Sequence, residues 1–172
     1  MLEIYTEIQN RLISEYGITI CDGVDPYSKE KNMCNYCKCK THRCAYFDGE
    51  NFKRVRNWKQ ENTVFSTYVL LHEIGHTLLR YESETEDEYR ASVFAIRKCK
   101  ELHIPLTREI VVKNQHNILN IYRSEASEYN GYDLFGIEKP EWLKTAEYYN
   151  VVKVYDEVFE VSMDEVIKNL SK

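Results

Sequence analysis

The sequence predicts an α+β fold that is mostly helical, with a small β-hairpin or sheet beside the helices. Apolar residues recur at helical spacing in several segments. Two short segments rich in aromatic and β-branched residues flank Asp48-Gly49, a dipeptide typical of hairpin turns. No repeat, low-complexity tract or long linker divides the 172 residues, so we expect one domain spanning 1–172.

The N-terminal third is expected to contain one helix, an irregular segment and the hairpin. Apolar residues recur every three or four positions over 2–16, and Gly17 is suited to cap the end of that helix. Turn-forming residues and cysteines make 18–44 irregular, and we treat 21–44 as a Cys-rich segment. The hairpin strands are predicted at 45–47 and 52–55.

A central helix is predicted to begin at Asn62 or Thr63, either of which could be its N-cap, and to run to about Arg80. Its apolar residues surround the helix almost completely, so we expect it to be buried. One stripe of this helix is formed by Phe65, Tyr68, Val69, His72, Gly75, His76 and Leu79. Glycine inside this stripe would let another backbone approach closely.

Further helices are predicted after the central one. An acidic stretch from Glu82 leads into a helix that ends near Leu102, and Pro105 separates it from a helix over 107–122. Gly131 and Gly136 are expected to mark a loop. Pro140 opens a segment over 141–149, and a last helix is predicted to start near Ser162.

The charge distribution argues against general binding to nucleic acid or to anionic membranes. The formal net charge is -5, although residues 29–59 carry a local +6 that we interpret as a solvated basic face. The N-terminus lacks the basic and apolar regions of a signal peptide, and the longest apolar stretch near the central helix covers only 68–71. We therefore expect a soluble, cytoplasmic protein without a membrane partner.

The central helix contains the motif H-E-x-x-H, formed by His72, Glu73 and His76. Residues four apart lie one turn apart on the same helical face, so both imidazoles can reach one ion. Zinc bound there would lower the pKa of a bound water toward ~7 and polarise a peptide carbonyl. Glu73 would accept the proton of that water as general base. Burying these polar groups without a partner would be costly, which favours a metal site over a chance occurrence.

A catalytic zinc takes a third protein ligand, and the acidic stretch after the central helix offers carboxylates. Glu88 is the best candidate, because it shares a helical face with the small or apolar residues Ala91, Ala95 and Cys99. That face could pack against the His72–His76 helix, and Asp87 is the second choice. Transition-state stabilisation needs a further donor. Spacing singles out none of the candidates Tyr89, His103, His116 and Tyr122.

These residues resemble the ImmA/IrrE-type zinc metallopeptidases, a gluzincin-like family. The resemblance is carried by Leu71-His-Glu-Ile-Gly-His-Thr-Leu-Leu79 and by Glu88-x-x-Ala91-x-x-Phe94-Ala95, with weaker similarity over 2–18 and 159–170. It implies that Glu88 is the third zinc ligand. Ser92 departs from the family pattern, which often has Asn or Asp at this position. The cysteine cluster is not a feature of the family.

The resemblance also implies a bacterial or phage endopeptidase that cleaves a regulatory protein, often a helix-turn-helix repressor. Two other functions remain open. The chain could bind metal as a non-proteolytic regulator, in which case Glu73 would be dispensable. It could also be a SprT-like protease acting on DNA-bound proteins, although that family uses a third histidine that is missing at suitable spacing here.

Four cysteines lie within eleven residues, at Cys34, Cys37, Cys39 and Cys44. Four thiolates can hold a second, structural zinc ion. The first pair has C-x-x-C spacing, but structural sites normally separate two ligand pairs more widely. Reduced thiols or a redox sensor remain alternatives, because the nearby Lys38 and Arg43 would lower thiol pKa values.

Overall fold

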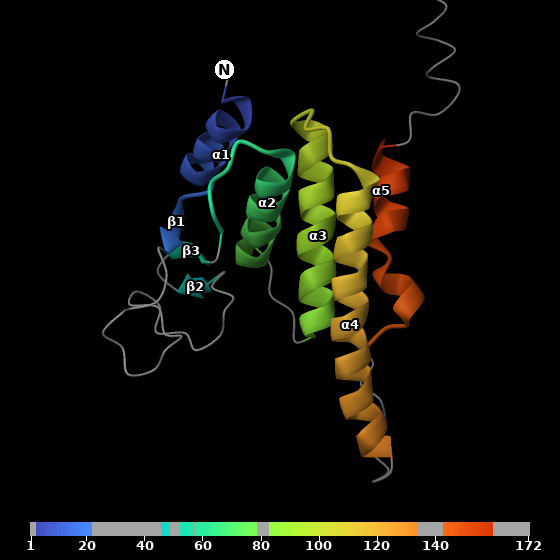
Figure 1. Ribbon diagram of the computed structural model, residues 1–172. Helices are drawn as coiled ribbons and strands as arrows, with labels where there is room; N and C mark the ends of the chain where they lie inside the picture. The colour runs from blue at the N-terminus through green and yellow to red at the C-terminus, as the bar shows by residue number, and fades with distance from the viewer. Residues whose placement is uncertain are drawn as a thin grey trace, which may run out of the picture.

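The computed structural model describes residues 3–21, 46–48, 52–56, 58–78, 83–133 and 143–159 (Figure 1). Along the chain its elements are α1 (Ile4–Glu15), β1 (Ile18–Cys21), β2 (Tyr46–Asp48), β3 (Phe52–Arg56), α2 (Val64–Leu78), α3 (Glu84–Glu101), α4 (Arg108–Asp133), the 3-10 helix η1 (Ala146–Tyr149) and α5 (Val151–Phe159). The described part is mostly helical, as the sequence predicts. None of the helices within these ranges combines the length and apolarity needed to cross a membrane.

The predicted first helix is present, and both of its ends have a visible cause. Asn62 Oδ1 accepts hydrogen bonds from the backbone N–H groups of Tyr5 and Thr6, so a residue distant in sequence caps the start of α1. Gly17 follows the helix with a φ of 61°, the left-handed conformation that glycine adopts at helix ends. Gln9 is fully buried and its Nε2 donates to Thr67 Oγ1 at 2.9 Å, which joins α1 to α2.

The strands form one small sheet in the order β1-β3-β2. β1 pairs in parallel with β3, and Ile20 lies opposite Val55. β2 pairs antiparallel with β3, from Tyr46 opposite Arg54 to Asp48 opposite Phe52. The residues that would form the turn of the predicted hairpin lie outside the described ranges, so the hairpin itself stays a prediction.

Helix α2 contributes to the centre of the core, as its apolar pattern predicts. Leu70, Leu71 and Ile74 are completely buried. Thr63 is the N-cap, since its Oγ1 accepts a hydrogen bond from Ser66 N at 3.0 Å. In Figure 1, α1 and the strands lie on one side of α2, and α3, α4 and α5 lie on the other.

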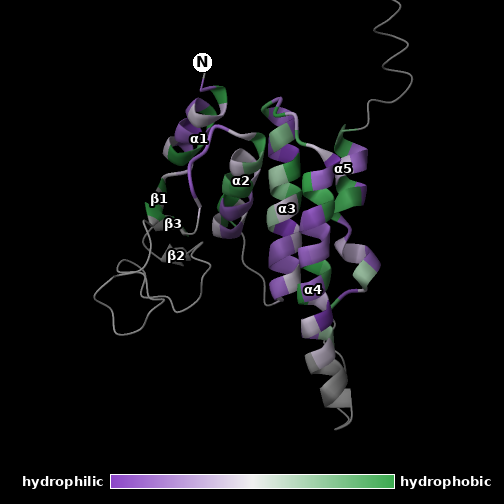
Figure 2. Cartoon of the chain, in the orientation of Figure 1, coloured by the Kyte–Doolittle hydropathy of each residue, from purple (hydrophilic) through white to green (hydrophobic). Residues whose placement is uncertain are grey.

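Helices α3 and α4 are amphipathic, and Figure 2 shows hydrophilic and hydrophobic residues alternating along both. Their buried apolar side chains are Ala91, Ala95, Ile96 and Cys99 on α3 and Val111 and Ile118 on α4. Burial raises the pKa of the Cys99 thiol to about 12, so the thiol stays protonated in the core.

The C-terminal predictions need two corrections. Gly131 does not mark a loop, because α4 continues through it to Asp133. One glycine costs a helix only about 1 kcal/mol, and the good helix formers before it outweigh that cost. Helix α5 was not predicted, because its consecutive valines favour strands. Asn150 supports its start by accepting a hydrogen bond from Lys153 N at 2.9 Å.

Candidate metal centre

The two histidines of the motif face each other on α2. Their Nε2 atoms are 3.0 Å apart and their ring centroids are 4.7 Å apart. The side chains are only 12% and 15% exposed, for His72 and His76 respectively. This placement follows from the four-residue spacing on a regular helix.

Helix α3 brings a carboxylate to the same point. Ser83 starts this helix as N-cap, with Oγ accepting a hydrogen bond from Glu86 N at 3.1 Å. Glu88 follows in the second turn and its side chain is 8% exposed. Glu88 Oε2 lies 3.1 Å from His72 Nε2, and Oε1 lies 3.4 Å from His76 Nε2.

The three side chains could hold a metal ion, because their ligand atoms all lie within 4.8 Å of one another. Four ligands placed tetrahedrally at zinc distances of about 2.0–2.1 Å would be about 3.3 Å apart. The observed separations of 3.0, 3.1 and 3.4 Å bracket that value. Two imidazoles and a carboxylate also form a ligand set known for zinc.

The electrostatics of the cluster favour a cation. Burial opposes ionisation of Glu88, but hydrogen bonds from His72 and His76 outweigh that effect and lower the pKa of the carboxyl group far below its usual value. Burial also opposes protonation of His76, yet its hydrogen bond and charge interaction with Glu88 raise its pKa. The carboxylate is therefore held ionised among nitrogen atoms that can accept a positive charge.

The close backbone approach expected at Gly75 is present. A Cβ atom placed on Gly75 would meet Ala91 Cα at 2.8 Å, closer than real Cβ atoms come, and Ala91 O at 3.1 Å, tighter than most such contacts. Ala91 lies three residues after Glu88 and Gly75 directly precedes His76. The glycine therefore sets how near the two ligand-bearing helices come.

Three polar side chains extend from the cluster to α4. Ser92 Oγ lies 3.2 Å from His72 Nδ1 and donates to the backbone oxygen of Glu88 at 2.7 Å. Asn114 Nδ2 donates to Ser92 Oγ at 2.7 Å and to the Tyr68 hydroxyl at 2.6 Å. Burial raises the pKa of Tyr68, so its hydroxyl stays protonated.

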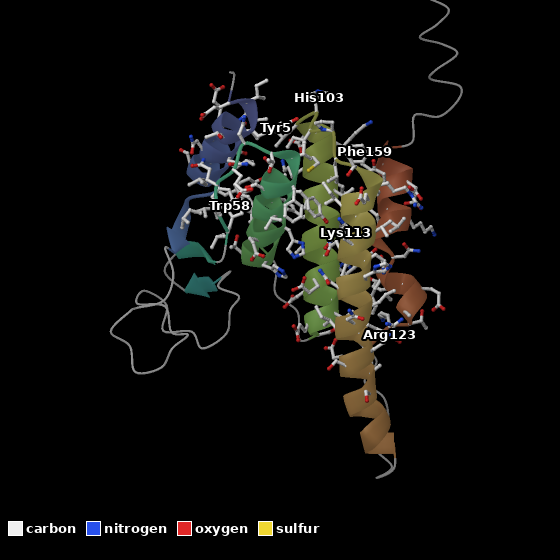
Figure 3. All side chains as sticks on the ribbon, in the orientation of Figure 1. Tyr5, Trp58, His103, Lys113, Arg123 and Phe159 are labelled. Carbon is white, nitrogen blue, oxygen red and sulfur yellow. The ribbon has the colours of Figure 1, made fainter. Side chains whose placement is uncertain are left out.

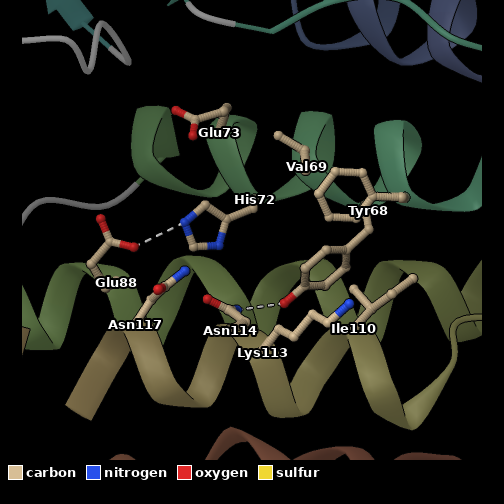
Figure 4. A pocket seen from close by; sticks show the side chains of 10 residues that line it. Tyr68, Val69, His72, Glu73, Glu88, Ile110, Lys113, Asn114 and Asn117 are labelled. Carbon is tan, nitrogen blue, oxygen red and sulfur yellow. Dashed lines mark hydrogen bonds and ion pairs between the residues drawn. The ribbon is translucent and has the colours of Figure 1, made fainter. Parts of the chain in front are cut away.

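A cleft of about 410 Å³ opens beside the candidate ligands (Figure 4). Its walls come from α2, α3 and α4, and Glu73 lies on the α2 wall with His72. Its remaining lining residues are Phe65, Tyr68, Val69, Glu88, Ile110, Lys113, Asn114 and Asn117. In Figure 4 the Lys113, Asn114 and Asn117 side chains rise from α4 toward α2. The cleft thus combines an apolar part with a polar part next to the ligands.

Comparisons with known proteins identify no relative. No protein-family model matches the chain, and searches of curated proteins and of solved structures find no match. The similarity to ImmA/IrrE-type peptidases therefore stays a resemblance carried by the two motifs.

The other candidates from the sequence lie elsewhere. His103 is exposed at the far end of α3, where its φ of 55° ends the helix (Figure 3). His116 is also exposed and does not line the cleft. Tyr89 and Tyr122 both pack against Tyr149 rather than lining the cleft. Asp87 does not belong to the ligand group. Three further predictions concern residues outside the described ranges: the four clustered cysteines, Gly136, and the last helix near Ser162.

Sequence reasoning missed the contribution of α4. Lys113, Asn114 and Asn117 recur at helical spacing, and such a polar set is normally interpreted as a solvated helix face. Asn114 is half-buried, although nothing in its local sequence distinguishes it from the exposed Asn117. The packing of α4 against α3 brings it to the cluster, where it also contacts Tyr68 of α2.

Proposed function

We propose that this chain is a zinc-dependent endopeptidase whose active site is the cleft at His72, His76 and Glu88. The observation that supports the proposal is the convergence of three largely buried ligand side chains, two of which, His72 and Glu88, line one open cleft together with Glu73. Hydrolysis of a peptide bond needs such a metal site together with a nearby proton acceptor.

His72, His76 and Glu88 would hold the ion, and their nitrogen and oxygen donors suit zinc. Zinc bound there would polarise a peptide carbonyl and lower the pKa of a coordinated water. Three protein ligands would leave a coordination position open to water or substrate, the arrangement known for catalytic zinc sites. A carboxylate as third ligand favours a metallopeptidase with two histidines and one glutamate over the SprT-like alternative, which uses a third histidine.

Glu73 would act as the general base. It is half-buried, directly follows His72 and lines the same cleft. A carboxylate at this position can take a proton from water in the cleft and later deliver it to the leaving amine. The amide of Asn117, on the opposite wall, can orient the peptide backbone by hydrogen bonds.

The substrate is proposed to be a protein, cleaved at a specific site in the cytoplasm. The apolar residues Phe65, Val69 and Ile110 offer a surface for a large side chain of the substrate. Phe65 is 57% exposed, so its ring is accessible to a substrate in the cleft. The resemblance to ImmA/IrrE-type peptidases extends the proposal to a helix-turn-helix repressor as substrate.

Glu73→Gln tests the enzymatic proposal. Removing the base while keeping its shape should lower peptide hydrolysis by about 10²- to 10⁴-fold, the usual contribution of general base catalysis. Zinc affinity should stay close to that of the wild type, because Glu73 is not part of the ligand group. Hydrolysis is measured on a peptide library, and zinc content by elemental analysis. Glu157→Gln is the control, since this residue on α5 is exposed, pairs with Lys153 at 4.0 Å and does not line the cleft.

The outcomes separate the remaining functions. Zinc binding without hydrolysis in the wild type, on the library and on a repressor encoded beside the gene, would favour a non-proteolytic regulator. Equal hydrolysis by wild type and Glu73→Gln would contradict the assigned base. A wild-type protein that takes up no zinc on titration would remove the central support of the proposal.

A further inference from the structure

We infer that Asn114 is a positioning residue for the metal triad, because it fixes the imidazole of His72 through the hydroxyl of Ser92. The inference rests on the proposed zinc site and concerns residues outside both sequence motifs. Asn114 comes from α4, which supplies none of the three candidate ligands. Its effect on the site would therefore be exerted through the side chains that it contacts.

The first step is the hydroxyl of Ser92, which has one hydrogen to donate. That hydrogen is directed to the backbone oxygen of Glu88, at an Oγ–O distance of 2.7 Å. Ser92 Oγ must then accept from His72 Nδ1, which lies 3.2 Å away. Ser92 is fully buried, so water is not available to replace either hydrogen bond.

The second step is the amide of Asn114, which keeps the hydroxyl in that orientation. Its Nδ2 donates to Ser92 Oγ at 2.7 Å and to the Tyr68 hydroxyl at 2.6 Å. Because Nδ2 is a donor, the hydrogen of Ser92 cannot turn toward it. The hydrogen bond to Tyr68, whose side chain is buried, holds the amide in place.

The consequence for His72 is a defined tautomer. With hydrogen on Nδ1, the lone pair of Nε2 faces His76 and Glu88, where the ion would bind. Outer-shell hydrogen bonds of this kind orient a ligand and typically affect metal affinity 10- to 100-fold. Asn114 thus supplies a second polar group behind Ser92, whose side chain is shorter than the Asn or Asp expected from the resemblance.

The test compares zinc affinities of four proteins by competition with a chromophoric chelator. Asn114→Leu removes the amide and keeps the branched arrangement of heavy atoms, and Ser92→Ala removes the hydroxyl. We expect each to lower zinc affinity by about 10- to 100-fold. The double variant should bind no more weakly than Ser92→Ala, because Asn114 acts through Ser92. Asn120→Leu, at an exposed asparagine of α4 that accepts a hydrogen bond from Arg123, should leave the affinity unchanged.

Two affinity results would overturn the inference. One is a folded Asn114→Leu protein that binds zinc as tightly as the wild type. The other is a double variant whose loss equals the product of the single losses, which would mean that the two residues act independently. Thermal unfolding of the metal-free proteins shows which variants are folded, and Ser92→Ala provides the test if Asn114→Leu is not.

Nitrogen NMR of His72 in the zinc-loaded protein separates this inference from the proposed function. The hydrogen on Nδ1, which Ser92 Oγ would accept, should exchange with water slowly in the wild type and faster in Asn114→Leu. Equal exchange rates in the two proteins would overturn the inference whether or not peptides are hydrolysed. Slow exchange in a wild type that binds zinc but hydrolyses no peptide would contradict the proposed function alone.

Discussion

The candidate ligands and the helix behind them differ in how they are specified. His72 and His76 are on one helix and Glu88 is on a neighbouring one, and short motifs in the sequence contain all three. Helix α4 contains no ligand, yet Asn114 contacts Ser92 and Tyr68 beside the cluster. The first region is defined by local spacing and the second by tertiary packing.

Helix α4 supports the ligand-bearing helices at two separate places. At the first, Asn114 contacts Ser92, whose side chain lies against His72. At the other, Glu125 Oε2 accepts hydrogen bonds from Ser83 Oγ at 3.1 Å and Thr85 N at 3.0 Å, at the start of α3. A helix without ligands can therefore decide where the ligands of its neighbours lie.

Of the substitutions that test this comparison, Glu88→Gln should have the largest effect, which is a loss of zinc affinity. The amide keeps the size of the side chain but removes the buried negative charge next to the two histidines. Outer-shell changes alone cost 10- to 100-fold in affinity, so loss of a ligand charge should lower zinc affinity by more than about 100-fold. Isothermal titration of the metal-free protein with zinc measures the change.

Asp87→Asn is the matched control for this prediction. Asp87 is the neighbouring acid, and it raises the pKa of His76 by its charge without belonging to the ligand group. Its substitution should change zinc affinity less than tenfold. A larger loss of zinc affinity in Asp87→Asn than in Glu88→Gln would mean that Glu88 is wrongly assigned as the third ligand.

Much of the candidate site could be predicted because helical periodicity turns sequence spacing into geometry. His72 and His76 follow directly from a four-residue separation, and Glu88 from the face that it shares with Ala91. The contributions of Asn114 and Glu125 could not be predicted, because nothing local relates them to the motifs. Their partners lie 22 and 42 residues away in sequence, at Ser92 and Ser83 respectively.

Glu125→Gln tests the second contact of α4. Its carboxylate accepts from backbone N–H groups at the positive end of the α3 dipole, including Glu84 N at 3.0 Å. An amide would lose the charge and place a donor against these donors. We expect the free energy of unfolding to fall by about 2 kcal/mol, between the cost of a lost cap and that of an unsatisfied buried group. Chemical denaturation of the metal-free protein measures it.

Glu101→Gln is the control for a carboxylate on the surface. Glu101 is 63% exposed and pairs with Lys98 at 2.8 Å near the other end of α3. Exposed pairs contribute between about 0 and 1 kcal/mol, so its substitution should change stability little. Equal changes in both variants would mean that capping by Glu125 contributes nothing beyond a surface charge.

The helices could be predicted where the apolar pattern is regular. The prediction failed where tertiary packing determines the secondary structure. The apolar spacing of 2–16 and 63–80 agrees with α1 and α2. Helix α5 begins with Val151 and Val152, whose propensity favours strands, but Val151 is completely buried against the other helices. Its formation depends on that burial, which sequence spacing alone does not show.

Gly75→Ala should have the smallest effect and tests how closely the two ligand-bearing helices must pack. The added methyl would collide with the backbone of Ala91, which cannot move as a flexible side chain would. Overpacking typically costs 1–3 kcal/mol, while alanine in place of glycine favours the helix by about 1 kcal/mol. We expect a net loss of about 1 kcal/mol in unfolding free energy, measured by chemical denaturation. Zinc affinity should also fall, because widening the gap moves Glu88 away from the histidines. Increased stability with unchanged zinc affinity would show that the separation of α2 and α3 does not control the site.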